Sequence, residues 1–255
     1  MENVNEYKDG SGEIDLKITI DKNEVILQGQ GDHEIMISDV QARWLASALH
    51  EHFGGGPSAD RETDRILFLT GEITEETVVD WQQELLRMSY REAQFAPEDR
   101  SPIIIFINTP GGYALDGLAL IDTIEYIRGM GLSVYGVVQG TAFSMGSILL
   151  QACTLRLVAR HGRVMVHSVR AGVCGSVEEM KAELAEIDFI NSVMGDIFAE
   201  RNTAGNKDPK FWLEFAHGTD KYLGAKECIA LGLADAEYNP LQQWDMREYE
   251  AALPK

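Results

Sequence analysis

Short apolar runs alternate with stretches of helical spacing from residue 65 to residue 238. A continuous apolar run is typical of a buried strand, whereas apolar residues three or four positions apart are typical of one helix face. The runs predict strands at residues 65–71, 103–107, 132–138, 155–158 and 164–166, the second of them covered on both faces. The helical spacings predict helices at residues 75–91, 115–127, 145–152, 176–200, 211–215 and 225–231. This alternation predicts an α/β fold with right-handed crossovers.

The first 60 or so residues follow a different pattern. Residues 14–20 alternate apolar and polar positions and pair with residues 25–27 in a predicted hairpin. Residues 38–41, Ser-Asp-Val-Gln, have the form of a capping box and predict a helix with its apolar side chains on one face. Residues 1–12 are polar and acidic and are predicted to be disordered.

A glycine-rich linker, Gly-Gly-Gly-Pro-Ser, occupies residues 54–58. The chain is therefore divided into an N-terminal strand-helix extension at 1–62, a main domain at 63–240 and a C-terminal tail at 241–255. Neither the extension nor the tail contains a recognisable catalytic pattern.

Charge and cysteine usage limit the partners. The chain has 255 residues and a formal net charge of -19, which disfavours nucleic acid and anionic membranes because both attract basic surfaces. Cys153, Cys174 and Cys228 stand singly with no metal-ligand spacing, so no metal and no cofactor are predicted. An odd number of cysteines, a polar start and the lack of a membrane-length apolar run favour a reducing cytoplasm.

The strongest candidate for chemistry is Ser144. It lies in Gly-Thr-Ala-Phe-Ser-Met-Gly-Ser, residues 140–147, between a predicted buried strand and a predicted helix. A serine at such a junction stands clear of the sheet beside free helix N-terminal amides, which can hold an oxyanion. The pattern Ala-x-Ser-x-Gly differs by one residue from the nucleophile elbow of hydrolases, and by itself it also suits a helix N-cap.

A nucleophilic serine needs a base, and six histidines are available. Only His167 ends a predicted buried strand, as Ser144 does. Strand ends at one edge of an α/β sheet are where functional groups converge. The pattern therefore favours His167 as the partner of Ser144.

Five motifs in order make the chain resemble the proteolytic subunit of the Clp protease, a family of serine peptidases. They are residues 65–69, 107–112, 140–146, 163–167, and 220–227 together with 231–235. The resemblance covers about two thirds of the chain. It implies a fold built as a stack of ββα units with a long handle helix, a fold shared in general form with crotonase-like enzymes.

The resemblance also implies residue roles. Ser144 would be the nucleophile, His167 the general base and Asp220 the carboxylate that orients the imidazole. The amides of Gly112 and Met145 would form the oxyanion hole.

Substrate contacts follow from the same resemblance. Gly111 would give the turn beside the oxyanion hole its conformational freedom. The extended loop at 171–175, with Ala171, Gly172 and Val173, would pair with the substrate backbone. Such pairing suits a protease that accepts many sequences.

The family's assembly is implied as well. Unfolded proteins would be hydrolysed inside two stacked seven-membered rings of identical subunits, with the helix from Ser176 joining the rings. An AAA+ unfoldase would feed the chamber.

The chain departs from the family pattern at several points. Phe143 replaces a small residue beside the nucleophile, and Ser168-Val169 replaces Gln-Pro after the histidine. The stretch 126–144 is longer than expected, and the extension precedes the family's usual start. The extension puts the contact with an unfoldase in question.

Two alternatives stay open. A hydrolase-like esterase would order its residues as serine, acid and histidine, using Ser144, Asp188 or Asp208, and His217. A catalytically silent subunit of a mixed ring would keep the fold without the activity.

Overall fold

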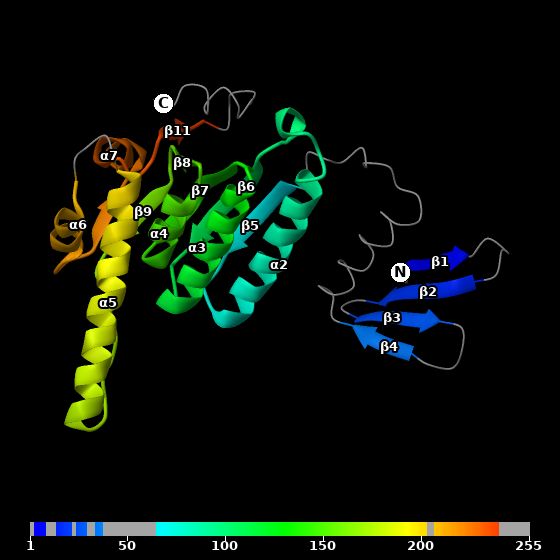
Figure 1. The fold of residues 1–255 in the computed structure, drawn as a ribbon, viewed down its shortest axis with the longest axis horizontal. Helices are drawn as coiled ribbons and strands as arrows, with labels where there is room; N and C mark the ends of the chain where they lie inside the picture. Colours follow the sequence, from blue (N-terminus) through cyan, green and yellow to red (C-terminus); the bar gives the residue numbers. More distant parts are fainter. Residues whose placement is uncertain are drawn as a thin grey trace. The chain divides into compact units, whose positions relative to one another are not determined.

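A computed structural model describes residues 3–8, 14–21, 24–29, 34–37, 65–202 and 207–239 (Figure 1). The chain divides into two compact units, residues 1–61 and 62–255. Each unit is described by itself below.

The first unit contains a four-stranded antiparallel sheet in the order β1-β2-β3-β4. Its strands are β1 (Asn3–Lys8), β2 (Ile14–Asp21), β3 (Glu24–Gly29) and β4 (Glu34–Ile37). The predicted hairpin is confirmed by the pairing of β2 with β3, in which Ile18 lies opposite Leu27.

Strand β1 corrects the prediction of disorder, which is wrong for residues 3–8. The segment has no apolar alternation of its own, but its backbone pairs with β2 from Asn3 opposite Ile20 onward. Ladder hydrogen bonds to a neighbouring strand do not depend on side-chain pattern, so polarity alone was a poor guide here. The helix predicted from Ser38 and the tail at 241–255 lie outside the described residues.

The second unit is built on a seven-stranded, mostly parallel sheet. The path β10-β9-β7-β6-β5 forms its main order, and β8 and β11 extend it from β7. The strands are β5 (Ile66–Thr70), β6 (Ile103–Thr109), β7 (Val134–Phe143), β8 (Leu155–Ala159), β9 (Arg163–Val166), β10 (Lys221–Leu223) and β11 (Ala236–Tyr238). Only β10 runs antiparallel to its neighbour, β9.

All six predicted helices are confirmed in this unit. They are α2 (Glu75–Glu92), α3 (Ala114–Gly129), α4 (Met145–Ala152), α5 (Val177–Arg201), α6 (Pro209–Ala216) and α7 (Ala225–Leu231), with a short 3₁₀ turn η2 (Pro97–Asp99). Figure 1 shows α2, α3 and α4 lying side by side along the sheet, with the long helix α5 beside them. The predicted α/β class is thus confirmed.

The sheet is covered more completely on one face than on the other. Alternate residues of β6, Ile103, Ile105 and Ile107, are buried in the main core, while Ile104 and Phe106 are only partly buried against a smaller cluster. The prediction of a strand fully covered on both faces is therefore wrong in part. The apolar run shows that side chains on both faces of the strand are hydrophobic. It does not show how completely other elements bury each face of the sheet.

Strand β7 organises the site because it changes partners along its length. Residues Tyr135–Val138 pair with β8, whereas Thr141–Phe143 pair with β9. The strand was predicted to end at Val138 and continues five residues further, to Phe143. The ladder with β6 shifts register near Asn108, whose Oδ1 accepts hydrogen bonds from the Thr141 amide (3.1 Å) and hydroxyl (3.2 Å).

Gly140 makes that shift possible. Its φ is 111°, and a Cβ there would lie 2.4 Å from Oδ1 of Asn108. A side chain would therefore push the two strands apart where they lead into the site. No helix in the part of the chain described here is long and apolar enough to cross a membrane.

Candidate active site

Ser144 lies on a sharp turn between β7 and α4, as predicted. Its φ of 53° and ψ of -122° make it the only non-glycine residue with positive φ among the described residues. Such a conformation costs about 1–3 kcal/mol and persists only where the surroundings fix it. Here the Ser144 amide donates to the Met165 carbonyl (2.9 Å), and the Ser144 carbonyl accepts from the amide (2.9 Å) and hydroxyl (2.6 Å) of Ser147.

Two glycines let α4 approach its neighbours closely. A Cβ at Gly146 would lie 2.4 Å from Cγ2 of Thr109, and a Cβ at Gly117 would lie 2.2 Å from Cγ of Met145. Close packing of α4 against β6 and α3 fixes the direction in which the helix N-terminus points. That N-terminus is immediately next to Ser144.

His167 contacts Ser144 directly. Its Nε2 lies 2.7 Å from Oγ of Ser144, at hydrogen-bonding distance. The contact follows from the pairing of β7 with β9, in which Phe143 lies opposite Met165, so both strands end side by side. The histidine is the residue directly after β9.

Asp220 arrives from a distant part of the chain. It directly precedes β10, which pairs antiparallel with β9 so that Lys221 lies opposite Val166. Oδ1 of Asp220 lies 3.4 Å from Nδ1 of His167, and Nδ1 is buried without a hydrogen-bond partner among the described residues. The structure therefore brings the three predicted residues together, with the histidine bonded to the serine and not to the carboxylate.

The surroundings lower the pKa of His167 below its ordinary value of 6.5. Burial is the largest cause, because it disfavours the charged imidazolium, and the nearby Arg170 cation acts in the same direction. The carboxylate of Asp220 opposes both effects. The net result favours a neutral imidazole, the form that can accept a proton.

The pH dependence of activity follows from that shift. If His167 is the base, activity is lost as the imidazole becomes protonated, and a lowered pKa moves this loss to lower pH. We expect the acid limb of the kcat/KM profile to have its midpoint below about pH 6.5. Hydrolysis of a fluorogenic peptide measured from about pH 4.5 to 8 gives this midpoint. A midpoint at or above the ordinary histidine value would contradict the expectation.

Met145 and the turn that contains Gly111 lie beside Ser144. Gly111 has a φ of 96°, and a Cβ there would lie 2.7 Å from Cβ of Ser144 and 3.2 Å from the amide nitrogen of Met145. Met145 is the first residue of α4, so its N–H has no acceptor within the helix.

Ile73 holds the neighbouring turn in place. Its amide donates to the Gly111 carbonyl (2.9 Å), and its carbonyl accepts from the Tyr113 amide (2.9 Å). These two hydrogen bonds link Ile73 to Gly111 and Tyr113, and the N–H of the intervening Gly112 takes part in neither. A Cβ at Gly112 would lie only 2.1 Å from the Ile73 carbonyl oxygen. The N–H of Gly112 thus takes no part in the bridge to Ile73, and the N–H of Met145 takes no part in the hydrogen bonds of α4.

The loop at 171–175 follows His167 without regular secondary structure. Ala171 and Gly172 are exposed, Val173 is half-buried, and a Cβ on Gly172 would meet open space. Its pairing with a substrate backbone stays a prediction.

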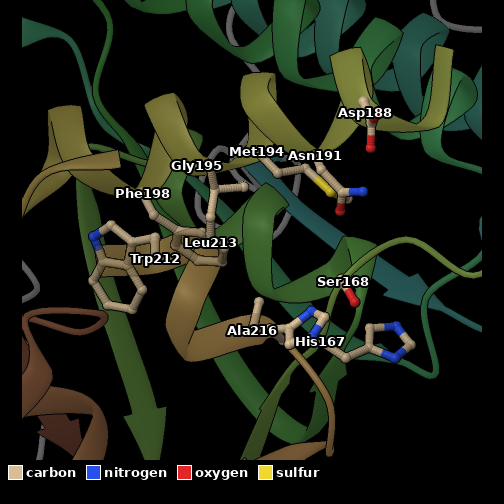
Figure 2. A pocket seen from close by; sticks show the side chains of 11 residues that line it. His167, Ser168, Asp188, Asn191, Met194, Gly195, Phe198, Trp212, Leu213 and Ala216 are labelled. Atoms are coloured by element: carbon tan, nitrogen blue, oxygen red, sulfur yellow. The ribbon is translucent and has the colours of Figure 1, made fainter. Parts of the chain in front are cut away.

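A cavity beside His167 was missed by sequence reasoning. It has a volume of about 190 Å³ and lies between α5 and α6 (Figure 2). Most of its wall is apolar: Met194, Phe198, Trp212, Leu213 and Ala216. Ser168, Asp188, Asn191 and His217 add polar groups, and Asn191 accepts a hydrogen bond from the Val169 amide (2.9 Å).

The packing of α6 on α5 forms most of the wall of this cavity. Gly195 of α5 allows the approach, since a Cβ there would lie 3.2 Å from the Pro209 carbonyl oxygen. The apolar spacing predicted the helix at 176–200, but nothing in that pattern indicated a cavity beside it. A short aromatic helix following a long one was the only available signal.

The structure also places the residues of the esterase alternative. Asp208 accepts a hydrogen bond from the Phe211 amide (2.8 Å) and caps α6. His217 and Asp188 line the cavity, and the hydrogen bond to Oγ of Ser144 involves His167. The geometry therefore gives the esterase arrangement no support.

Phe143, one of the departures from the family pattern, packs against Tyr222. The two rings meet edge to face with centroids 5.4 Å apart. Within the described ranges, no group of three or more His, Cys, Asp or Glu side chains is arranged to hold a metal ion.

Comparison with known proteins agrees with the fold. Residues 60–238 match the Clp protease family. The chain is 34% identical over 174 residues to the ATP-dependent Clp protease proteolytic subunit 2 of Chlamydia trachomatis serovar D, covering 68% of this chain and 79% of the relative. It is 31% identical over 176 residues to the ATP-dependent Clp protease proteolytic subunit 1 of Prochlorococcus marinus, covering 68% and 83%. The chain therefore belongs to the Clp protease family.

Proposed function

We propose that the chain is a serine endopeptidase that hydrolyses peptide bonds of unfolded proteins with Ser144, His167 and Asp220. The observation that carries the proposal is the 2.7 Å contact between Oγ of Ser144 and Nε2 of His167, at a strained turn directly before the first residue of α4. A plain helix N-cap has no need of positive φ or of a histidine partner.

The chemistry follows from the positions of these groups. Nε2 of His167 takes the proton of Oγ as Oγ attacks the peptide carbonyl, and the N–H groups of Gly112 and Met145 stabilise the oxyanion. The imidazolium then gives its proton to the leaving amine, which leaves an acyl group on Ser144. Water attacks this acyl group by the same route in reverse and releases the second product.

The cavity supports an assignment for the substrate. Its apolar wall and its position next to His167 suit a side chain flanking the scissile bond, held by Met194, Phe198 and Trp212. The loop at 171–175 would hold the peptide backbone alongside.

Assembly into rings is part of the proposal. The buried residues of α5 all lie in its second half, from Ile190 onward, whereas Leu184 (53% exposed) and Phe189 (60% exposed) lie uncovered in this chain. A long helix with exposed apolar side chains suits contact with another copy. We propose stacked, heptameric rings in the cytoplasm, served by an AAA+ unfoldase; the relatives' names describe ATP-dependent proteases with more than one proteolytic subunit.

Replacing Leu184 by aspartate tests the assembly. Burial of a leucine side chain contributes about 1.5–3 kcal/mol. Its loss should therefore raise the dissociation constant between two copies of the chain at least about tenfold. We expect a smaller particle in sedimentation velocity with unchanged circular dichroism, because the side chain is exposed in the single chain. Glu183→Asp, at the neighbouring exposed position, is the control. An unchanged particle mass in Leu184→Asp would argue against this interface.

One observation favours a second candidate, the catalytically silent subunit. The histidine lacks its hydrogen bond to Asp220, and an unoriented imidazole is a poor base. Labelling with a serine-reactive fluorophosphonate separates the two: the proposed peptidase carries the adduct on Ser144, and His167→Ala does not. A folded oligomer without any adduct would favour the silent subunit.

A further inference from the structure

Asp220 is bonded to two neighbours other than His167. Its Oδ1 accepts a hydrogen bond from Nη2 of Arg170, and its Oδ2 accepts one from the Tyr222 hydroxyl at 3.4 Å. The same Oδ1 is 3.4 Å from Nδ1 of His167, an ion-pair distance at which the geometry falls short of a full hydrogen bond.

Nδ1 of His167 is therefore left without a good hydrogen-bond acceptor in the described part of the chain. For Nε2 to accept the Ser144 proton, Nδ1 must carry the ring's own proton. Nδ1 is buried and makes no full hydrogen bond with any of the residues that the structure describes. A buried donor without a partner is unfavourable, so a carboxylate free to move would be expected to reach it. A charge-assisted bond to Arg170 is the strongest contact that holds Asp220 away.

We propose that Arg170 is an autoinhibitory latch, which holds Asp220 away from His167 until its release lets the carboxylate complete the triad. The proposal rests on the proposed function, since it concerns the orientation of the same base. Arg170 is a positioning residue: it acts on His167 through Asp220.

The position of Arg170 indicates what releases it. It lies three residues after His167 and directly before the loop at 171–175, and its side chain is 65% exposed. Because the arginine side chain is largely exposed, a bound ligand can reach it and compete for its hydrogen bonds. A peptide strand bound along the loop would compete for this arginine and free Asp220. Binding of a long substrate would thus itself complete the site.

The charged groups around His167 come from several elements. Arg170 lies on its own segment and Asp220 before β10, while Asp188 of α5 and His217 after α6 line the shared cavity. Only Arg170 contacts Asp220 as a cation among the residues described. Removing that single charge is therefore a selective test.

Arg170→Gln is the test variant, and Arg87→Gln, which breaks an Arg–Glu pair on α2, is the matched control. We expect the rate of Ser144 labelling by a small fluorophosphonate to rise about two- to fivefold in Arg170→Gln, in keeping with the modest strength of an exposed pair. The rate should stay unchanged in Arg87→Gln and nearly unchanged in Arg170→Lys. Hydrolysis of a long peptide should rise less, because such a substrate releases the latch in the wild type.

Salt and pH give readouts that a merely structural role would not move. Raising the ionic strength from about 0.05 M to about 1 M should speed labelling of the wild type and not of Arg170→Gln, since salt screens the exposed pair. The acid limb of the labelling profile should move to higher pH in Arg170→Gln, because a cation that lowers the pKa of His167 is gone.

The outcomes distinguish the latch from the proposed function. Labelling of Ser144 at an equal or lower rate in Arg170→Gln overturns the latch and leaves the peptidase standing. No labelling of Ser144 in either protein overturns both. Labelling that appears only in Arg170→Gln supports both.

Discussion

Replacing Ser144 by alanine is expected to lower peptide hydrolysis by about 10⁴- to 10⁶-fold, the range seen when a nucleophilic serine is removed. The backbone should be little affected, because alanine keeps the Cβ and the bonds that fix the turn are made by main-chain atoms and by Ser147. The change removes only Oγ and its contact with His167. A steady-state assay with a fluorogenic peptide, on protein checked by circular dichroism and sedimentation, measures the loss.

Ser133→Ala is a matched control for this experiment. Ser133 is half-buried in the loop before β7, and its carbonyl, which accepts a hydrogen bond from the Ile103 amide (2.9 Å), is kept by the substitution. Its activity should equal that of the wild type. Retained peptide hydrolysis in Ser144→Ala would show that Ser144 is not the nucleophile.

The second large effect is expected from Gly112→Ala. A Cβ at this position would lie 2.1 Å from the carbonyl oxygen and 2.7 Å from the nitrogen of Ile73, distances that real Cβ atoms do not adopt. Because both contacts are with backbone, the turn must move and its N–H must turn away from the oxyanion. Loss of one such donor costs about 10²- to 10³-fold in kcat.

The measurement is kcat and KM determined separately for the variant and the wild type. An oxyanion donor acts on the transition state, so its loss should lower kcat with little change in KM. Gly129→Ala is the control: Gly129 ends α3, and a Cβ there would meet nothing within 4 Å. A Gly112→Ala enzyme with normal kcat would exclude this amide as a donor. A loss confined to KM would assign the turn to substrate binding.

The local pattern of apolar and polar residues was sufficient to predict most helices and strands of the second unit. The helix predicted at 75–91 is observed as α2, in which Val78, Trp81, Leu85 and Met88 are buried. The helix predicted from Ser176 begins as expected, capped by Ser176 and Glu179. These features depend on residues within a few positions of one another, so a single sequence contains them.

Other features depend on which segments pair. The polar strand β1 was predicted to be disordered because its pattern gives no hint of the partner that orders it. The end of β7 was placed five residues early, since the register shift at Asn108 and Gly140 is a contact between two strands. The cavity between α5 and α6 likewise exists only once two helices have packed.

The sequence by itself determined that Ser144 stands at a strand-to-helix turn and that His167 ends a buried strand, because both follow from apolar runs adjacent in the chain. It assigned Asp220 only through the resemblance to a family. Tertiary structure decided that β9 lies between β7 and β10, which brings the ends of three separate segments to one place. It also decided that Asp220 is hydrogen-bonded to Arg170 and lies 3.4 Å from Nδ1 of His167. A carboxylate's choice between two nearby donors depends on distances set by the whole fold, and no spacing along the chain records it.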